Sequence, residues 1–215
     1  MSIKWKLAQN LELKWWRNYL RKQPISSYLQ KKHAYWQRVL GLIQLQLPNK
    51  ARVLDAGCGP AGIFLIMEEQ KVVAIDPLLN QYEEQLAHFK TAWYPQVDFR
   101  AHKLEALSSN QKFDFVFCLN VINHVEDLDL VLDRFKTVLV PGGKLILSVD
   151  SHRFPLLKRI FQLLPGDVLH PHQFSWEDYK TKLQQRGFQI EQELLLKSTR
   201  IFDYWILEAQ LRPGL

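Results

Sequence analysis

The sequence predicts a doubly wound α/β fold, in which helices cover both faces of a mostly parallel sheet. From Arg52 onward, short apolar runs alternate with segments at helical spacing, an alternation typical of parallel sheets. The runs are almost uninterrupted in apolar residues, which indicates strands that are buried on both faces. A chain of 215 residues with 47% apolar content is also long enough to bury one sizeable core.

The N-terminal part, residues 1–49, differs in composition from the rest. Residues 1–50 hold ten Lys or Arg but a single acid, Glu12, together with four of the seven Trp. We expect this part to form a basic, Trp-rich helical lid, and residues 50–215 to form the core.

Two helices are predicted within the lid. Apolar residues recur every four positions in Ile3–Arg21, which predicts the first. Pro24 ends it, and Ser26 or Ser27 is expected to cap the second.

The core is predicted from five apolar runs and the helical stretches between them. The strands are expected at Val53–Ala56, Val72–Ile75, Val97–Arg100, Phe113–Leu119 and Lys144–Val149. The helices are expected at Ala61–Gln70, Gln81–Trp93 and Leu128–Val138.

The C-terminal part is predicted to add an antiparallel pair of strands. A helix at Trp176–Arg186 is expected to begin after Ser175, a good N-cap residue with Asp178 three positions on. Two apolar runs follow, with only four residues between them, and so short a connection forces an antiparallel pairing. These runs are Phe188–Leu196 and Ile201–Leu211.

The segment between the fifth strand and this helix, residues 150–174, is too long for an ordinary connection. Its amphipathic stretch and the N-terminal helices are expected to roof a substrate site with apolar and aromatic walls. The alternative is ordinary packing of helices onto the sheet.

The most informative segment is the glycine-rich turn that follows the first strand. Gly57 and Gly59 lack a Cβ, so backbone N–H groups can approach a bound ligand closely. Asp55 stands directly before this turn, where it would repel a pyrophosphate but attract a ligand that carries an ammonium and a sulfonium. Asp76, twenty-one residues later, can accept hydrogen bonds from ribose hydroxyls. An N-cap role for Asp76 is the alternative, and the two roles can coexist.

Two further features narrow the interpretation: the fourth strand ends in a small polar set at Leu119-Asn120, and a Pro141-Gly142-Gly143 turn precedes the fifth strand. With these motifs the chain resembles the class I S-adenosylmethionine-dependent methyltransferases, in the broad group that includes quinone-biosynthesis and other small-molecule enzymes. The resemblance implies a Rossmann-like, seven-stranded sheet that ends in an antiparallel hairpin. It also implies S-adenosyl-L-methionine as methyl donor and S-adenosyl-L-homocysteine as product.

The resemblance assigns the cofactor contacts residue by residue. The methionine part would lie against the glycine turn, the ribose against Asp76, and the transfer site near the end of the fourth strand. The residues implied are Asp55, Gly57, Cys58, Gly59, Asp76, Pro77, Lys103, Leu104, Leu119 and Asn120.

Lys103 departs from the family pattern. An acid usually follows the third strand and accepts from the adenine amino group, but a lysine side chain has no acceptor. Either the backbone around Lys103–Leu104 hydrogen-bonds to the adenine, or the side chain of Glu105 does so.

Methyl transfer from a sulfonium needs alignment above all, and a general base only where the acceptor must lose a proton. The candidate bases are His124, His152, His170 and His172. His124 is favoured because its loop borders the transfer site in the family, although it can equally pack behind the fourth strand. No metal site is expected, because no further ligand types accompany these histidines.

The sequence leaves several functions and partners open. The favoured one is methyl transfer to a small, apolar or aromatic oxygen, nitrogen or carbon nucleophile. The alternatives are a protein that binds the cofactor without turnover, and an RNA- or lipid-directed methyltransferase that uses the basic N-terminus. A peripheral membrane or anionic contact through residues 1–40 fits the Trp and Lys content, but no dedicated nucleic-acid module is present.

A cytoplasmic location is expected. No apolar run resembles a secretory leader or a membrane span, and two cysteines, Cys58 and Cys118, cannot build a disulfide framework.

Overall fold

The computed structural model describes residues 3–108, 110–152, 174–199 and 202–213. They belong to two compact units, Met1–Leu104 and Glu105–Leu215, here called unit 1 and unit 2. Most of the predicted roof at 150–174, with His170 and His172, lies outside the described residues, and so does the side chain of His152.

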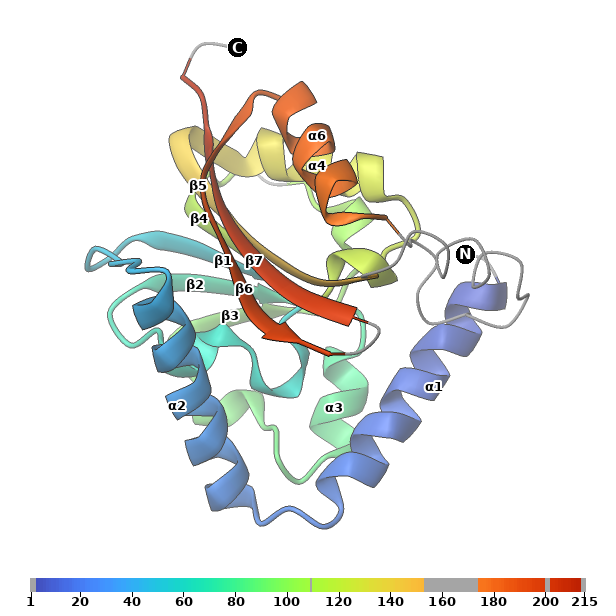
Figure 1. Ribbon diagram of the computed structural model, residues 1–215. Helices are drawn as coiled ribbons and strands as arrows, with labels where there is room; N and C mark the ends of the chain where they lie inside the picture. Colours follow the sequence, from blue (N-terminus) through green and yellow to red (C-terminus); the bar gives the residue numbers. More distant parts are fainter. Residues whose placement is uncertain (1–2, 109, 153–173, 200–201, 214–215) are drawn as a thin grey trace. The chain divides into compact units, whose positions relative to one another are not determined.

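Seven strands of one mixed sheet confirm the predicted fold class (Figure 1). In unit 1 the order is β3-β2-β1, and all three strands are parallel. In unit 2 the order is β4-β5-β7-β6; β4 and β5 are parallel, whereas β7 is antiparallel to both β5 and β6. The bounds are Arg52–Ala56, Lys71–Ile75 and Val97–Arg100 for β1 to β3, and Phe113–Leu119, Leu139–His152, Phe188–Ser198 and Phe202–Leu211 for β4 to β7.

β5 is longer than the predicted strand, and the Pro141-Gly142-Gly143 turn lies within it rather than before it. Phe113 is paired with Leu139 and Phe115 with Lys144, so one residue of β4 stands opposite four of β5. The extra residues form a bulge, for which Gly142 supplies a φ of +77°.

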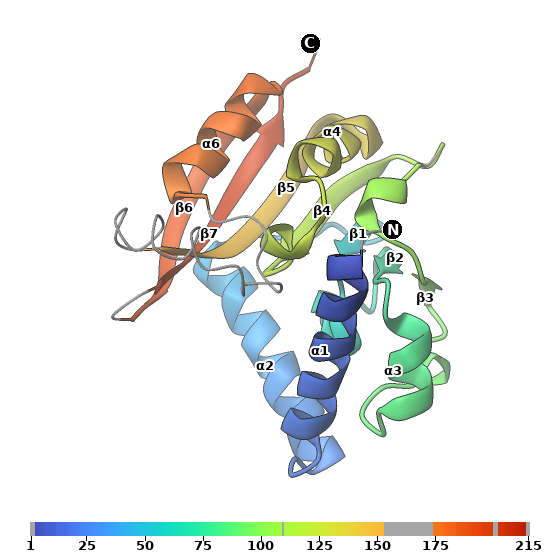
Figure 2. The same ribbon diagram turned by 90° about the vertical axis from the view of Figure 1, so that its right-hand side faces the viewer.

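The two N-terminal helices are α1 (Ile3–Leu20) and α2 (Ile25–Leu42), as predicted. Both views show α1 beside α3 (Figures 1 and 2), and residues of the two helices are in contact. The predicted serine cap of α2 is wrong. Pro24 is the N-cap residue, and its carbonyl accepts from the N–H of Tyr28 (2.9 Å), because the fixed φ of proline both ends α1 and starts α2.

The α-helix predicted at Ala61–Gln70 is also wrong. Two short 3₁₀ helices, Gly59–Ala61 and Ile63–Ile66, occupy this stretch, with extended backbone at Gly62 between them. The N–H of Phe64 donates to the Asp55 carboxylate (3.1 Å). This buried carboxylate takes the donor that an α-helix through the segment would have used.

The helix predicted at Gln81–Trp93 is much shorter than expected. α3 spans Leu79–Gln85, and a 3₁₀ helix follows only at Thr91–Trp93. Between them the chain becomes extended at Leu86 and buries Phe89 fully. The ring of Phe89 packs edge-to-face on Phe64 and Phe99, with centroids 6.3 and 5.4 Å away, and this aromatic packing outweighs continuation of the helix.

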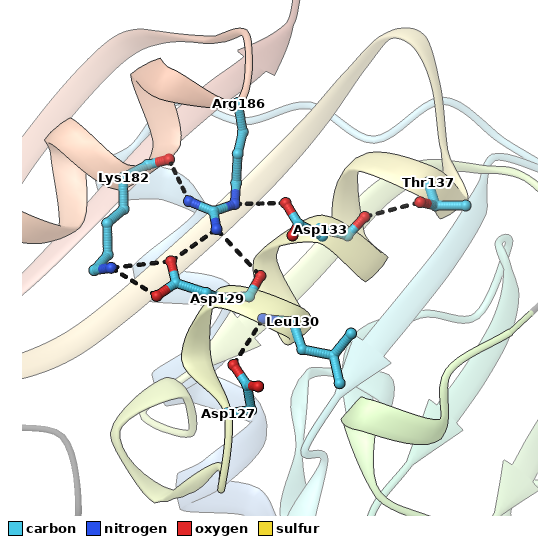
Figure 3. A network of polar contacts seen from close by, with 7 residues as sticks. All are labelled: Asp127, Asp129, Leu130, Asp133, Thr137, Lys182 and Arg186. Atoms are coloured by element: carbon cyan, nitrogen blue, oxygen red, sulfur yellow. Dashed lines mark hydrogen bonds and ion pairs between the residues drawn. The ribbon is translucent and has the colours of Figure 1, made fainter.

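In unit 2 the predicted helices are confirmed as α4 (Leu128–Val138) and α6 (Trp176–Gln185), and Ser175 and Asp178 form the expected capping box. Charged side chains link the two helices (Figure 3). Arg186, directly after α6, donates to Asp129 and Asp133 of α4 at 2.7 Å each, and Lys182 donates to Asp129 at 2.9 Å. Among the described helices, none combines the length and the apolar character needed to cross a membrane.

Candidate cofactor-binding site

The glycine turn is held at the end of β1 by the neighbouring strand. The backbone N–H groups of Gly57 and Cys58 both donate to the carbonyl of Ile75, the last residue of β2, at 2.7 and 3.1 Å. Gly57 and Gly59 have φ values of +78° and +55°, which other residues rarely adopt. The sequence therefore predicted correctly where the turn needs glycine.

Asp55 is turned toward the backbone of this turn. Its side chain is buried, and its Oδ2 accepts from the N–H of Phe64 at 3.1 Å. A Cβ added at Gly62 would lie only 2.4 Å from the same oxygen and 2.5 Å from the carbonyl oxygen of Cys58. Besides the charge predicted for it, Asp55 thus shapes the loop.

Asp76 joins the glycine turn to the start of α3. Its Oδ2 accepts from the N–H of Gly59 at 3.0 Å, and its Oδ1 accepts from the N–H of Leu78 at 2.8 Å. The second bond is the capping interaction considered from the sequence, although the N-cap residue of α3 is Leu78. Pro77, between these residues, is half-buried. The carboxyl group thus lies at the turn, where the ribose assignment requires it.

The sequence did not identify the acid that α1 adds to this region. Tyr82 Oη of α3 donates to Glu12 Oε1 at 3.2 Å. The Trp16 ring, one turn further along α1, lies edge-on to Tyr82 with centroids 6.4 Å apart. A Cβ at Gly59 would meet this same indole at 3.8 Å, so the inner face of α1 covers the glycine turn. The sequence did contain one signal that could have identified Glu12: it is the only acid among the first 50 residues.

The three acids share a buried environment that disfavours their charged forms. Burial raises the pKa of Asp55 to about 7. Burial, and next the charge of Glu12, raises the pKa of Asp76 to about 7. Burial also raises the pKa of Glu12. Shifts of this kind gather at functional sites, where charged groups are held away from water.

Three more of the predicted residues have clear positions in unit 1. The Lys103 ammonium lies over the indole of Trp5, 3.5 Å from the ring centroid. The lysine that replaces the usual acid after β3 therefore contacts α1. Leu104 is buried. Cys58 is buried too, and burial raises the pKa of its thiol, which agrees with a small apolar filling role.

The remaining predicted residues belong to unit 2, at the carboxyl end of β4. Leu119 pairs with Ser148 of β5, and the Asn120 N–H donates to the Ser148 carbonyl at 2.9 Å. Asn120 has a φ of +59°. His124 is half-buried and ends a 3₁₀ helix, Ile122–His124. Asn123 in the same turn is buried, and within the described residues its Oδ1 accepts no hydrogen bond.

A comparison with known families now decides the class of the protein. A family model described as "Methyltransferase domain" matches residues 28–193. The chain belongs to this family. The expected membership among the class I S-adenosylmethionine-dependent methyltransferases is confirmed, and with it an enzyme that uses S-adenosylmethionine.

Curated relatives of this methyltransferase share a name. The chain is 30% identical to the ubiquinone biosynthesis O-methyltransferase of Xanthomonas axonopodis pv. citri over 176 residues, 76% of this chain and 72% of that protein. It is 33% identical over 101 residues to the protein of the same name from Nitrobacter winogradskyi, 45% of this chain and 38% of that protein. The second match therefore spans well under half of the relative's length.

Solved structures of methyltransferases share the fold. The 1,6-didemethyltoxoflavin-N1-methyltransferase of Burkholderia thailandensis has a TM-score of 0.60 at 16% identity, with 96% of this chain and 87% of that chain covered. The N-methyltransferase NodS of Bradyrhizobium japonicum has a TM-score of 0.61 at 15% identity, with 90% of each chain covered. Both structures contain S-adenosylhomocysteine. At such identities the similarity concerns the fold alone.

The chemistry of unit 1 fits S-adenosylmethionine. This cofactor carries two positive groups, an ammonium and a sulfonium, and its ribose hydroxyls are hydrogen-bond donors. The buried carboxyl groups of Asp55 and Asp76, the half-buried one of Glu12 and two glycines with positive φ offer charge, acceptors and close approach of the backbone. The pyrophosphate of a dinucleotide would be repelled by the same carboxyl groups.

The crowding at Gly62 can be tested by adding one methyl group. We expect Gly62→Ala to lower the free energy of unfolding by about 1–3 kcal/mol, because the new Cβ overlaps the Asp55 carboxylate and the Cys58 carbonyl. Gly41→Ala is the control. Gly41 lies in α2 with nothing within 4 Å of an added Cβ, so alanine there should stabilise the protein by about 0.5–1 kcal/mol. Equal effects in urea denaturation would contradict this description of the loop.

The raised carboxyl pKa values predict an unusual pH dependence of stability. Asp55 and Asp76 have pKa values of about 7 in the folded state, against an ordinary value of 3.8. Their contribution to stability is therefore full below pH 3.8 and is lost as the pH rises through 7. From pH 5.5 to 8, we expect the cofactor-free protein to lose about 2 kcal/mol per carboxyl, because the loss stops once the pH has passed the folded-state pKa.

Chemical denaturation at several pH values measures this loss, and Asp76→Asn should remove about half of it. Glu84→Gln, which changes an exposed carboxyl on α3, should leave the slope unchanged. If Asp76→Asn left the pH dependence of the free energy of unfolding unchanged, ionisation of Asp76 would not destabilise the fold, and the raised pKa would be contradicted.

Proposed function

We propose that this methyltransferase transfers a methyl group to a hydroxyl oxygen of a small, apolar or aromatic molecule. The observation that carries the proposal is the 30% identity over 176 residues to a ubiquinone biosynthesis O-methyltransferase, because that relative's name states oxygen as the methylated atom. Nitrogen and carbon acceptors are the competing outcomes. Binding without turnover and RNA- or lipid-directed transfer are not favoured by the relatives.

The inner face of α1 supports the proposed cofactor site in unit 1. Asp76 is assigned the ribose hydroxyls, and Glu12, which accepts from Tyr82 near the same turn, adds negative charge and a further acceptor. Gly57 and Gly59 admit the methionine part, while Asp55 holds the loop and contributes charge. The backbone at Lys103 and Leu104 is assigned the adenine, since the lysine side chain lies on Trp5.

When bound, S-adenosylmethionine supplies a methyl group already activated by the sulfonium. The part of this chain would be to hold an acceptor oxygen in line with that methyl group and to keep water away from it. His124 is assigned the proton that the acceptor hydroxyl loses, as general base. The neighbouring Asn123 offers a buried Oδ1 without a donor among the described residues, which suits a hydrogen bond from the acceptor.

The domain roles proposed from the sequence follow from the same assignment. Residues 1–49 act as a lid, which the position of Trp16 over Gly59 supports. Residues 150–174 complete the substrate roof. The cytoplasm is the proposed location, on composition alone.

Cofactor affinity tests the carboxyl assignments. By calorimetry, Asp76→Ala should weaken S-adenosylmethionine binding by roughly 1.5–3 kcal/mol for each charged hydrogen bond lost. Glu12→Gln should weaken S-adenosylmethionine more than S-adenosylhomocysteine, because only the former carries the sulfonium charge. It should not lower the free energy of unfolding at pH 8, since it removes a buried acid.

Glu84→Gln serves as the matched control and should leave both affinities unchanged. An unaltered affinity in Asp76→Ala would exclude the ribose role. Equal losses for the two ligands in Glu12→Gln would show that its charge does not discriminate between them.

The methyl acceptor is tested with methyl-labelled S-adenosylmethionine and matched phenol, aniline and RNA acceptors. We expect label in the methyl ether of a phenol with an apolar substituent, and none in RNA. His124→Gln should lower kcat by roughly 10²–10⁴-fold with little change in cofactor affinity. His33→Gln, at a half-buried histidine of α2, is the control. If only the aniline became labelled, the proposed oxygen acceptor would be wrong and nitrogen would be the methylated atom.

A further inference from the structure

The outer face of α1 carries an exposed apolar stripe. Its members follow one another at intervals of four residues, so they lie along one side of an 18-residue helix. They are Leu7, Leu11, Trp15 and Tyr19, with exposed fractions of 48, 40, 54 and 42%. The rings of Trp15 and Tyr19 stack with centroids 5.0 Å apart and an angle of 6° between their planes. We call these four residues the α1 stripe.

The neighbouring side of α1 is the one that packs on unit 1. Glu12 accepts from Tyr82, Trp16 packs on Tyr82, and Leu20 is only 2% exposed. The rings of Trp15 and Tyr19 also lie edge-on to Trp16, and Tyr19 lies edge-on to Tyr28. Even with these contacts, the four residues of the α1 stripe stay 40–54% exposed, so the packing of unit 1 leaves a second apolar face on α1 uncovered.

The charges beside the α1 stripe have one sign. Lys14 and Arg17 of α1, and Arg21 and Lys22 directly after it, are exposed. Glu12 is the only acid in this part of the chain, and it belongs to the inner face. The outer side of α1 thus combines aromatic and aliphatic side chains with cations, without an anion.

We propose that the α1 stripe and the cations beside it attach this protein to the surface of an anionic lipid bilayer. A Trp and Tyr pair suits the boundary between headgroups and acyl chains, while Lys and Arg side chains reach the lipid phosphates. At about 1.5 Å per residue, α1 is about 27 Å long and lies in the plane of the interface. The proposal is independent of which atom the enzyme methylates.

Charge separates the bilayer from the other occupants of such a face. In a symmetric contact between two copies, the same patch would meet itself, and the cations of one copy would face those of the other. A nucleic acid would satisfy the cations but would leave the two leucines in contact with phosphates and water. Of these three occupants, an anionic bilayer is the one that satisfies both kinds of side chain.

Co-sedimentation with vesicles tests the proposal on the full chain. We expect binding to vesicles of phosphatidylcholine with about one third phosphatidylglycerol, and at least fivefold weaker binding to phosphatidylcholine alone. Leu11→Ser/Trp15→Ser should lower the partition coefficient at least tenfold. Lys14→Glu/Arg21→Glu should lower it at least fivefold, and only at low salt.

The matched control is Trp93→Ser, because Trp93 is a 45% exposed tryptophan of unit 1 outside α1. It should bind vesicles like the wild type, and circular dichroism should show all variants folded. Wild-type binding by Leu11→Ser/Trp15→Ser would overturn the proposal. So would a dimer in solution that this variant abolishes, or binding to an RNA homopolymer that excludes the vesicles.

Discussion

The carboxyl group of Asp76 is the constraint on which the rest of unit 1 depends. Its two oxygens accept from Gly59 and Leu78, and its backbone N–H donates to the Arg100 carbonyl at 3.3 Å. One residue thereby connects the glycine turn after β1, the end of β2, the start of α3 and the end of β3. Because this acid is buried, every element that it joins is positioned around a group that water cannot stabilise.

The buried acids of the two units are treated differently. In unit 2, Glu208 is buried but receives a cation, with Lys144 Nζ at 2.6 Å and Gln192 Nε2 at 3.1 Å. Asp55 and Asp76 receive backbone N–H groups, which stabilise the ionised form less than a cation does. Glu208 is thus neutralised by a neighbouring cation, whereas Asp55 and Asp76 hold the glycine turn and are paired with no cation among the described residues. This uncompensated charge supports the proposal that a positively charged cofactor binds there.

The sequence predicted the fold class, all seven strands and the helices α1, α2, α4 and α6, because apolar periodicity is a local signal. It failed where distant side chains decide the backbone. The Asp55 carboxylate replaces an α-helix by two 3₁₀ helices, and the burial of Phe89 shortens α3. Within the site, the motif and the family resemblance predicted the roles of Asp76 and the glycines, and these roles stay predictions. Glu12 was missed because its role depends on the packing of α1, which local periodicity does not contain.

α1 accounts for the one departure from the family pattern, Lys103. The acid expected after β3 is replaced by Lys103, whose ammonium lies on Trp5, so α1 contacts the residues after β3 as well as the glycine turn. The proposed cofactor site and the proposed bilayer contact use two different faces of α1. If both ligands bind, any coupling between them through α1 must be reciprocal: cofactor favours attachment to the bilayer by as much as the bilayer favours cofactor. The lid and membrane interpretations of the basic N-terminus are therefore compatible, because they do not compete for the same face of the helix.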